Sequence, residues 1–230
     1  MAELIVALDL PGGAEALRLL DLLPEVRWVK VGSILMTREG PDLVRRLVDR
    51  GLRVFLDLKW HDIPNTVAEA VSAAATLGVA MATDHTLGGT TMMAAAAEAA
   101  AGRVSMVGVT VLTSHEAASY GRAVGRSEVD LGDEVERLSR AAIAAGLAGV
   151  VCSPHEVAAV RTAVGSEALL VVPGIRGRSE ARGDQSRVAT AADAAAAGAT
   201  HLVVGRPILR AAAPRAAFRR LLAEAQCVGS

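Results

Sequence analysis

The chain has 230 residues and a formal net charge of −1, so no overall basic field is available to recruit nucleic acid or an acidic membrane surface. Hydrophobic residues make up 52% of the chain but aromatic residues only 2%, so Ala, Val and Leu must fill the core. No apolar run reaches the ~18 residues of a membrane span, and we expect no signal peptide at the start of the chain. Cys152 and Cys227 lie far apart, outside any metal-spaced set, which favours a reduced, cytoplasmic protein.

Short apolar runs alternate with longer helix-like stretches along the chain. We predict strands at residues 4–8, 28–31, 54–58, 79–83, 105–110, 149–152, 169–172 and 201–204. The helices predicted between them cover residues 13–23, 41–50, 66–77, 90–101 and 131–145. In the second helix, apolar pairs at 43–44 and 47–48 recur with the four-residue spacing of a helix packed on a sheet.

Strands and helices in this alternation are typical of a closed parallel barrel. We therefore predict a (β/α)8 TIM barrel that forms one domain over residues 1–230. An open doubly wound sheet is the alternative, but its first turn usually reads GxGxxG, whereas residues 9–13 read DLPGG. Two connecting segments are long, at 114–130 and 174–187, and the second is rich in Gly, Arg and Ser, so we expect it to act as a lid.

Charged residues follow the predicted strands, at the end where a barrel carries its catalytic side chains. The densest group occupies residues 57–62, DLKWHD, after the third strand. Asp57 and Lys59 are two residues apart, so on an extended strand they would share one face, and Lys30 from the neighbouring strand can join them. One interpretation is a cluster of surface ion pairs that contributes little to stability. The other is an alternating array in which carboxylates keep a lysine charged inside a cleft.

A separate signal for phosphate follows the seventh and eighth strands, where barrels often bind this group. The two segments read PGIR at 173–176 and VGRP at 204–207. Gly205 would let the backbone approach an anion closely, and a helix starting there would offer free N–H groups. Arg206 adds a planar guanidinium for phosphate oxygens. The alternative is an ordinary helix start with an exposed arginine.

Residues 55–66, which read FLDLKWHDIPNT, resemble the signature of the orotidine 5′-phosphate decarboxylase family. The resemblance covers nearly the whole chain in order, with VALD at 6–9, VKVG at 29–32, VTVLTS at 109–114, GDQ at 183–185 and the two segments just described. A DxKxxD pattern alone would also suit related sugar-phosphate decarboxylases, but the IPNT and GDQ segments are more specific. One departure is that His85 is followed by Thr86-Leu87, where the family tends to have a small residue, and we expect a local change in packing there.

The resemblance implies a cofactor-free enzyme that converts orotidine 5′-phosphate to UMP and CO2, the last step of de novo pyrimidine nucleotide biosynthesis. It also implies a homodimer with active sites at the subunit interface, in which Asp62 and Thr66 reach into the partner subunit's site. Asp57 and Lys59 would flank the reacting carbon, and Lys30 would complete the catalytic set with Asp62. The positions that would bind the substrate are Asp9 and Lys30 at the ribose, Thr113 and Ser114 near the pyrimidine, and Arg176, Gln185, Gly205 and Arg206 at the phosphate or closing over it.

The implied chemistry needs a fixed cation. Loss of the carboxylate at C6 leaves a carbanion in the plane of the ring, and the ring π system cannot delocalise it. The sequence has no pyridoxal or thiamine signature and no metal-ligand spacing, so we expect neither cofactor nor metal. Lys59 would stabilise the developing charge and then protonate C6. Two alternatives stay open: a metal-dependent sugar-phosphate decarboxylase or lyase on the same barrel, and a nucleotide-binding barrel without catalysis.

Overall fold

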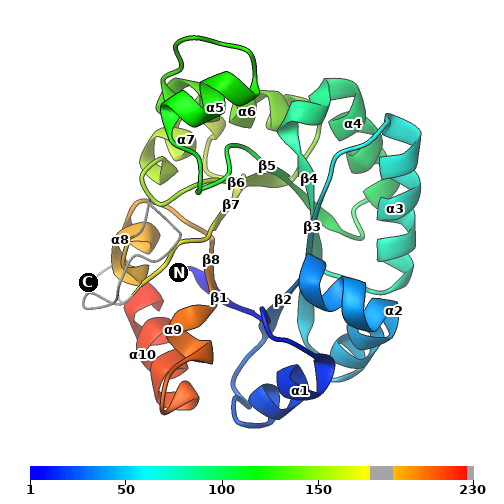
Figure 1. Ribbon diagram of the computed structural model, residues 1–230, viewed down its shortest axis with the longest axis vertical. Helices are drawn as coiled ribbons and strands as arrows, with labels where there is room; N and C mark the ends of the chain where they lie inside the picture. The colour runs from blue at the N-terminus through cyan, green and yellow to red at the C-terminus, as the bar shows by residue number, and fades with distance from the viewer. Residues whose placement is uncertain (177–188, 227–230) are drawn as a thin grey trace.

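The computed structural model describes residues 1–176 and 189–226, and its centre is a closed barrel of eight parallel strands (Figure 1). Each strand pairs with the next in chain order, and β1 pairs with β8. This confirms the predicted (β/α)8 TIM barrel and rules out the open sheet. The strands are β1 (Glu3–Ala7), β2 (Trp28–Gly32), β3 (Arg53–Trp60), β4 (Met81–His85), β5 (Ser105–Val109), β6 (Gly149–Val151), β7 (Leu169–Val172) and β8 (His201–Val204).

Helices form a ring outside the barrel (Figure 1). For four of the five predicted helices, both the first and the last residue lie within two residues of the prediction. Among the described residues, no helix is long and apolar enough to cross a membrane. The helices are α1 (Gly13–Asp21), α2 (Ser33–Asp49), α3 (Pro64–Thr76), α4 (Gly89–Ala100), α5 (Ala117–Ala123), α6 (Leu131–Ala144), α7 (Val157–Val164), α8 (Ala191–Ala196), α9 (Arg206–Leu209) and α10 (Pro214–Gln226), with a short 3₁₀ turn, η1 (Thr86–Gly88).

The start of α2 differs from the prediction. Proline is typical of the first turn of a helix, which made Pro41 look like a helix start. In the structure the helix already begins at Ser33 and is broken at Gly40, whose φ of +66° is a conformation open to glycine. Helical turns therefore precede the break and bring residues 33–39 close to the end of β2.

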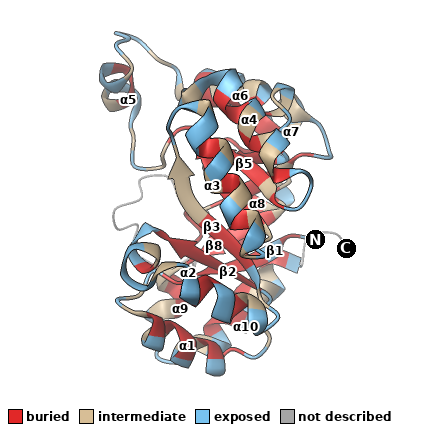
Figure 2. Cartoon of the chain, turned by 90° about the vertical axis from the view of Figure 1, so that its right-hand side faces the viewer, coloured by how far each residue is buried: buried red, intermediate tan, exposed pale blue. Residues whose placement is uncertain are grey.

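The core has two layers, because successive strand residues point to opposite faces of the barrel wall. The larger layer lies between the strands and the helices, where Val, Leu and Ala predominate. The strands are mostly buried, except for the second half of β3, which is only partly buried (Figure 2). The smaller layer fills the barrel interior and supplies the floor on which a site can stand. Its members are Ile5, Ala7, Trp28, Phe55, Met81, Val107, Val171 and Val203.

The two long connecting segments have different outcomes. The prediction that residues 114–130 form a loop is wrong in part, because α5 lies within them. The Ser119 hydroxyl accepts from the backbone N–H of Glu116 and donates to its carbonyl, which closes the first turn of this seven-residue helix. Most of the predicted lid at 174–187 lies outside the described residues, which omit 177–188. At its edges Ile175 and Ala189 form a parallel bridge, so the two ends of the segment lie side by side.

Candidate active site

A cavity of about 600 Å³ opens at the carboxyl ends of the barrel strands. Its floor includes Phe55, Val171 and Val203 from the interior layer of the core. Eight of the residues predicted from the sequence line it. They are Asp9, Lys30, Asp57, Lys59, Thr113, Arg176, Gly205 and Arg206. Segments far apart in the chain thus meet at one cavity, as the barrel topology requires.

Other predicted site residues do not line this cavity. Asp62, Thr66 and Ser114, all within the described part of the chain, are exposed and lie outside the lining. Asp62 follows β3, and its carboxylate accepts from the backbone N–H of Ile63 at 2.7 Å. Gln185 lies outside the described residues, so its predicted role at the phosphate stays a prediction.

Lysines and aspartates alternate on the cavity wall. Lys30 Nζ lies 3.0 Å from Asp9 Oδ1 and 3.5 Å from Asp57 Oδ2, so it is held between two carboxylates. Lys59 Nζ lies 2.7 Å from Asp57 Oδ1. The Lys30 side chain is 11% exposed and that of Lys59 is 37% exposed. Lys59 is therefore the more accessible side chain of the two lysines that line the cavity.

The backbone at Lys59 departs from the extended strand that the sequence analysis assumed. Lys59 has φ of +54°, in the left-handed region, and the β3–β4 register shifts between Leu56 and Trp60. For a residue with a side chain this conformation costs on the order of 1–2 kcal/mol, and such strain concentrates at functional sites. The hydroxyl of Thr83 on β4 offsets part of that cost, since it accepts from the Lys59 backbone N–H at 2.8 Å. Asp57 and Lys59 both line the cavity, as their two-residue spacing predicts, and the left-handed turn of the backbone comes at Lys59 itself.

The electrostatics of the array centre on Asp57. Burial favours its neutral form, but the positive charges of Lys30 and Lys59 and hydrogen bonds from Lys59 and Thr83 outweigh burial. Together they hold the pKa of Asp57 below its ordinary value. The Thr83 hydroxyl donates to Asp57 Oδ1 at 3.2 Å. The carboxylate is therefore ionised at neutral pH and fixed on both sides.

The rim after β7 and β8, which adjoins Asp9 through the pairing of β8 with β1, carries arginines. Arg176 follows β7, and Gly205 and Arg206 follow β8. The helix after Gly205 supplies fewer free N–H groups than predicted. It is only four residues long, Pro207 has no N–H, and those of Ile208 and Leu209 donate to the Gly205 carbonyl. Arginine side chains must therefore provide most of any anion binding at this end.

Two residues of the site were missed by sequence reasoning. Thr83 holds both Asp57 and the Lys59 backbone, and its signal was a polar residue on the inward face of a barrel strand. Arg210 lines the cavity one helical turn after Arg206, and the four-residue spacing between these two arginines was the available signal.

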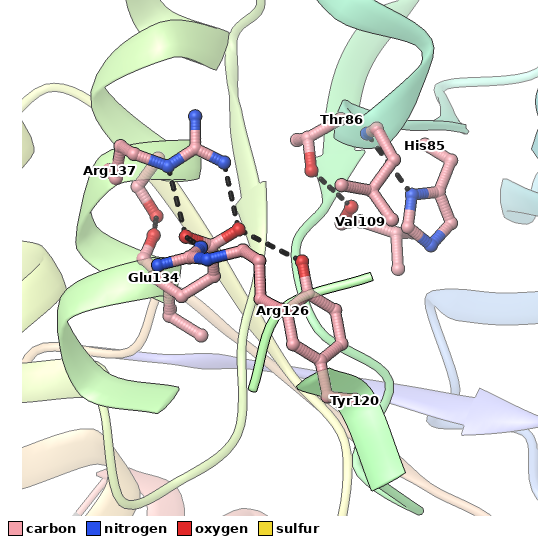
Figure 3. A network of polar contacts seen from close by, with 10 residues as sticks. His85, Thr86, Val109, Tyr120, Arg126, Glu134 and Arg137 are labelled. Atoms are coloured by element: carbon pink, nitrogen blue, oxygen red, sulfur yellow. Dashed lines mark hydrogen bonds and ion pairs between the residues drawn. The ribbon is translucent and has the colours of Figure 1, made fainter. Parts of the chain in front are cut away.

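Buried polar groups stand on β4 next to the array. His85 accepts from the backbone N–H of Leu87 at 3.3 Å (Figure 3) and stacks on His61. Burial, and then the charges of His61 and Lys59, lower the pKa of His85 to about 4, so its imidazole is neutral. Asp84 is fully buried, its carboxyl oxygens have no hydrogen-bond partner within the described part of the chain, and burial raises its pKa to about 7. Across residues 1–176 and 189–226, no group of three or more His, Cys, Asp or Glu is arranged to hold a metal ion.

Comparisons with known proteins identify the family of this chain. Residues 2–221 match the model of the orotidine 5'-phosphate decarboxylase / HUMPS family. The chain is 51% identical to an orotidine 5'-phosphate decarboxylase of Halorhodospira halophila, with 99% of this chain and 97% of the relative covered. It is 52% identical to the enzyme of that name from Alkalilimnicola ehrlichii, with 96% and 94% covered.

A solved structure shows the same architecture. The crystal structure of orotidine 5'-phosphate decarboxylase from Lactobacillus acidophilus superposes with a TM-score of 0.87 at 33% identity, covering 99% of this chain and 100% of that one. The match spans the barrel and every segment that lines the cavity. With family model, relatives and fold in agreement, the chain belongs to the orotidine 5'-phosphate decarboxylase / HUMPS family.

Proposed function

We propose that this chain decarboxylates orotidine 5′-phosphate to UMP and CO2, the last step of de novo pyrimidine nucleotide biosynthesis. The observation that carries the proposal is the array of Asp9, Lys30, Asp57 and Lys59 on the wall of the cavity. The names of relatives about half identical to this chain support it. Because the sequence indicates a reduced protein, we place the activity in the cytoplasm.

Lys59 is the residue that meets the reacting carbon in this proposal. Its ammonium is anchored by Asp57, while its side chain is more than a third exposed and lines the cavity, so the anchored ammonium can meet a substrate there. A positive charge held there favours the transition state, in which negative charge develops at C6, over the ground state. Once CO2 has left, the same ammonium donates a proton to C6 and forms UMP.

Asp57 fixes Lys59, and its ionised carboxylate also lies where the substrate carboxylate would approach. Repulsion between the two carboxylates would raise the energy of the bound substrate, and this repulsion ends when CO2 departs. Lys30 limits that repulsion, because it contacts Asp57 from the other side and also holds Asp9. In this proposal Asp9 and Lys30 additionally bind the ribose hydroxyls.

The phosphate would sit on the far side of the cavity, against Arg176, Arg206 and Gly205, with Gln185 closing over it. Thr113 and Ser114 would lie at the pyrimidine. The phosphate is remote from the bond that breaks, but binding energy there orients the ring and drives closure of the site. Of these residues, Thr113, Arg176, Gly205 and Arg206 line the cavity in the structure.

We also propose a homodimer in which Asp62 and Thr66 complete the partner subunit's site. Both are exposed here and lie outside the cavity lining, as residues that act across an interface would be. The same rim carries apolar side chains with large exposed fractions: Ile34 at 55%, Ile63 at 66% and Leu87 at 40%. They follow β2, β3 and β4, which are neighbours in the barrel, so a second copy could cover them together.

The function is tested by ultraviolet absorbance of orotidine 5′-phosphate with purified protein in excess EDTA. We expect full turnover in EDTA, because the residues assigned here act without a metal. Activity that depends on an added divalent metal, and that extends to sugar phosphates, would favour the lyase alternative. Tight UMP binding without turnover would favour the non-catalytic one.

The shared site is tested by complementation. Lys59→Ala and Asp62→Ala each damage both sites of their own homodimer. A mixed dimer contains one site free of both substitutions, so mixing the two variants is expected to restore part of the activity. Verified mixed dimers that stay inactive would show that Asp62 does not act across the interface.

A further inference from the structure

Residues 112–130, between β5 and α6, form an arm that leaves the barrel rim and returns to it. At its base, Leu112 and Thr113 line the cavity. Farther out, α5 stands off from the barrel (Figure 2). A helix of seven residues is too short to be stable by itself in water. Contacts to the barrel must therefore set the position of the arm.

One carboxylate on α6 receives those contacts. The side chain of Glu134 is 4% exposed, although it lies in the first turn of the helix. It accepts hydrogen bonds from Tyr120 Oη at 3.0 Å and Arg126 Nη1 at 2.9 Å, which both belong to the arm (Figure 3). Arg137, on α6 itself, donates to it at 3.0 and 2.8 Å. Two arm side chains thus converge on one buried acceptor.

We call the hydrogen bonds from Tyr120 and Arg126 to Glu134 the anchor of the arm. The charges in this cluster strengthen it. The hydrogen bond from Arg137, with those from Tyr120 and Arg126, outweighs burial and lowers the pKa of Glu134 to about 2. Burial and the neighbouring Glu134 raise the pKa of Tyr120 to about 12, so its hydroxyl keeps the proton that it donates. Hydrogen bonds to a charged acceptor are stronger than those between neutral groups, and a buried charge left without donors is costly.

A chain of contacts leads from this anchor to the cavity. The Tyr120 ring meets the His115 ring edge-on, with 5.9 Å between centroids. The His115 backbone N–H donates to the Leu112 carbonyl at 2.9 Å and closes a tight turn around Thr113 and Ser114. The turn is therefore tied to the barrel at Leu112 and to the anchored Tyr120 through His115.

We infer that Glu134 is a positioning residue, which fixes the arm through Tyr120 and Arg126 so that the turn at residues 112–115 meets the pyrimidine. This inference rests on the proposed function, which puts the base beside that turn. Asp9 and Arg206, at the ribose and phosphate ends, follow β1 and β8 on another part of the rim. Loss of the anchor should therefore weaken recognition of the base and leave recognition of the sugar phosphate unchanged.

The test compares the affinities for UMP and for ribose 5-phosphate by calorimetry, in Tyr120→Phe and Arg126→Ala. These variants remove one donor each and leave the Glu134 carboxylate in place, so they avoid the folding risk of Glu134→Gln. We expect UMP binding to weaken by about tenfold, the usual effect of losing one hydrogen bond to a charged group. Ribose 5-phosphate binding is expected to stay within twofold of wild type, and kcat/KM for orotidine 5′-phosphate to fall with the UMP affinity.

Arg137→Ala is the matched control, because it removes donors to the same carboxylate from α6 and not from the arm. It is expected to keep UMP affinity within twofold. Three results would each overturn the inference. They are an equal loss of affinity for UMP and for ribose 5-phosphate in the arm variants, a loss of UMP affinity in Arg137→Ala as large as theirs, and unchanged UMP affinity in both arm variants. Wild-type protein that binds UMP without turnover would instead refute the proposed function and leave the arm measurement valid.

Discussion

Replacing Asp84 by asparagine should stabilise the protein at alkaline pH and not at acidic pH. Asp84 is fully buried on β4, and within the described part of the chain its two carboxyl oxygens have no hydrogen-bond partner. Burial raises its pKa from 3.8 to about 7. Because the folded-state pKa lies above the unfolded value, the stability contributed by this group is full below pH 4 and is lost as pH rises to 7.

The magnitude follows from the size of the shift. A shift of about 3 pKa units, at 1.36 kcal/mol each, corresponds to ~4 kcal/mol over the whole range. Roughly 2–3 kcal/mol of this falls between pH 5 and pH 8. Asparagine has nearly the same shape but does not titrate, so Asp84→Asn lacks this loss. The free energy of unfolding of the variant, relative to wild type, should therefore rise by that amount across the interval.

The assay is urea denaturation of both proteins at several pH values between 5 and 8. Glu98→Gln is the control, since it neutralises an exposed carboxyl on α4. That variant should track wild type at every pH. A difference between Asp84→Asn and wild type that stays constant within ~0.5 kcal/mol from pH 5 to pH 8 would refute the reasoning. It would mean that the buried carboxyl does not take up a proton in the folded state.

Two further predictions concern the cavity. Arg206→Ala should lower kcat/KM for orotidine 5′-phosphate by the equivalent of ~2–5 kcal/mol, because the phosphate loses a charged partner, and a loss below threefold in initial rates would contradict this. Thr83→Val should lower kcat by about tenfold with little change in UMP affinity, since it removes the hydroxyl that holds Asp57 and the Lys59 backbone. Thr86→Val is the control and should keep wild-type kcat. Thr86 directly follows β4, and its buried hydroxyl donates to the Val109 carbonyl and not to the array. Equal effects in the two threonine variants would argue against a role for Thr83 in the array.

The barrel was predictable because its strands are short, apolar and separated by helical segments. β7 and β8 match their predicted bounds, since Leu169–Val172 and His201–Val204 are buried runs flanked by residues that end strands. The helix α5 was missed because seven residues are too few to show a helical period. Its position depends on Glu134, which lies beyond it in the sequence and gives no local signal.

The cavity was predictable where its residues stand directly after strands. The prediction of Asp9, Lys59 and Arg206 required only the positions of the strands and the rule that barrels carry their sites at one rim. Three-dimensional details were not accessible in this way. The left-handed backbone at Lys59 is a tertiary feature held by Thr83, and no local pattern marks it. The burial of Asp84 likewise depends on packing around β4.

The central claim is that the Lys59 ammonium stabilises the charge at C6 and then protonates that carbon. The most direct measurement compares turnover of orotidine 5′-phosphate with calorimetric binding of UMP in Lys59→Ala. We expect a loss of kcat of at least ~10³-fold while UMP still binds, because the substitution removes a charged donor at the reacting carbon and leaves the phosphate end intact. Turnover within tenfold of wild type in the purified variant would contradict it.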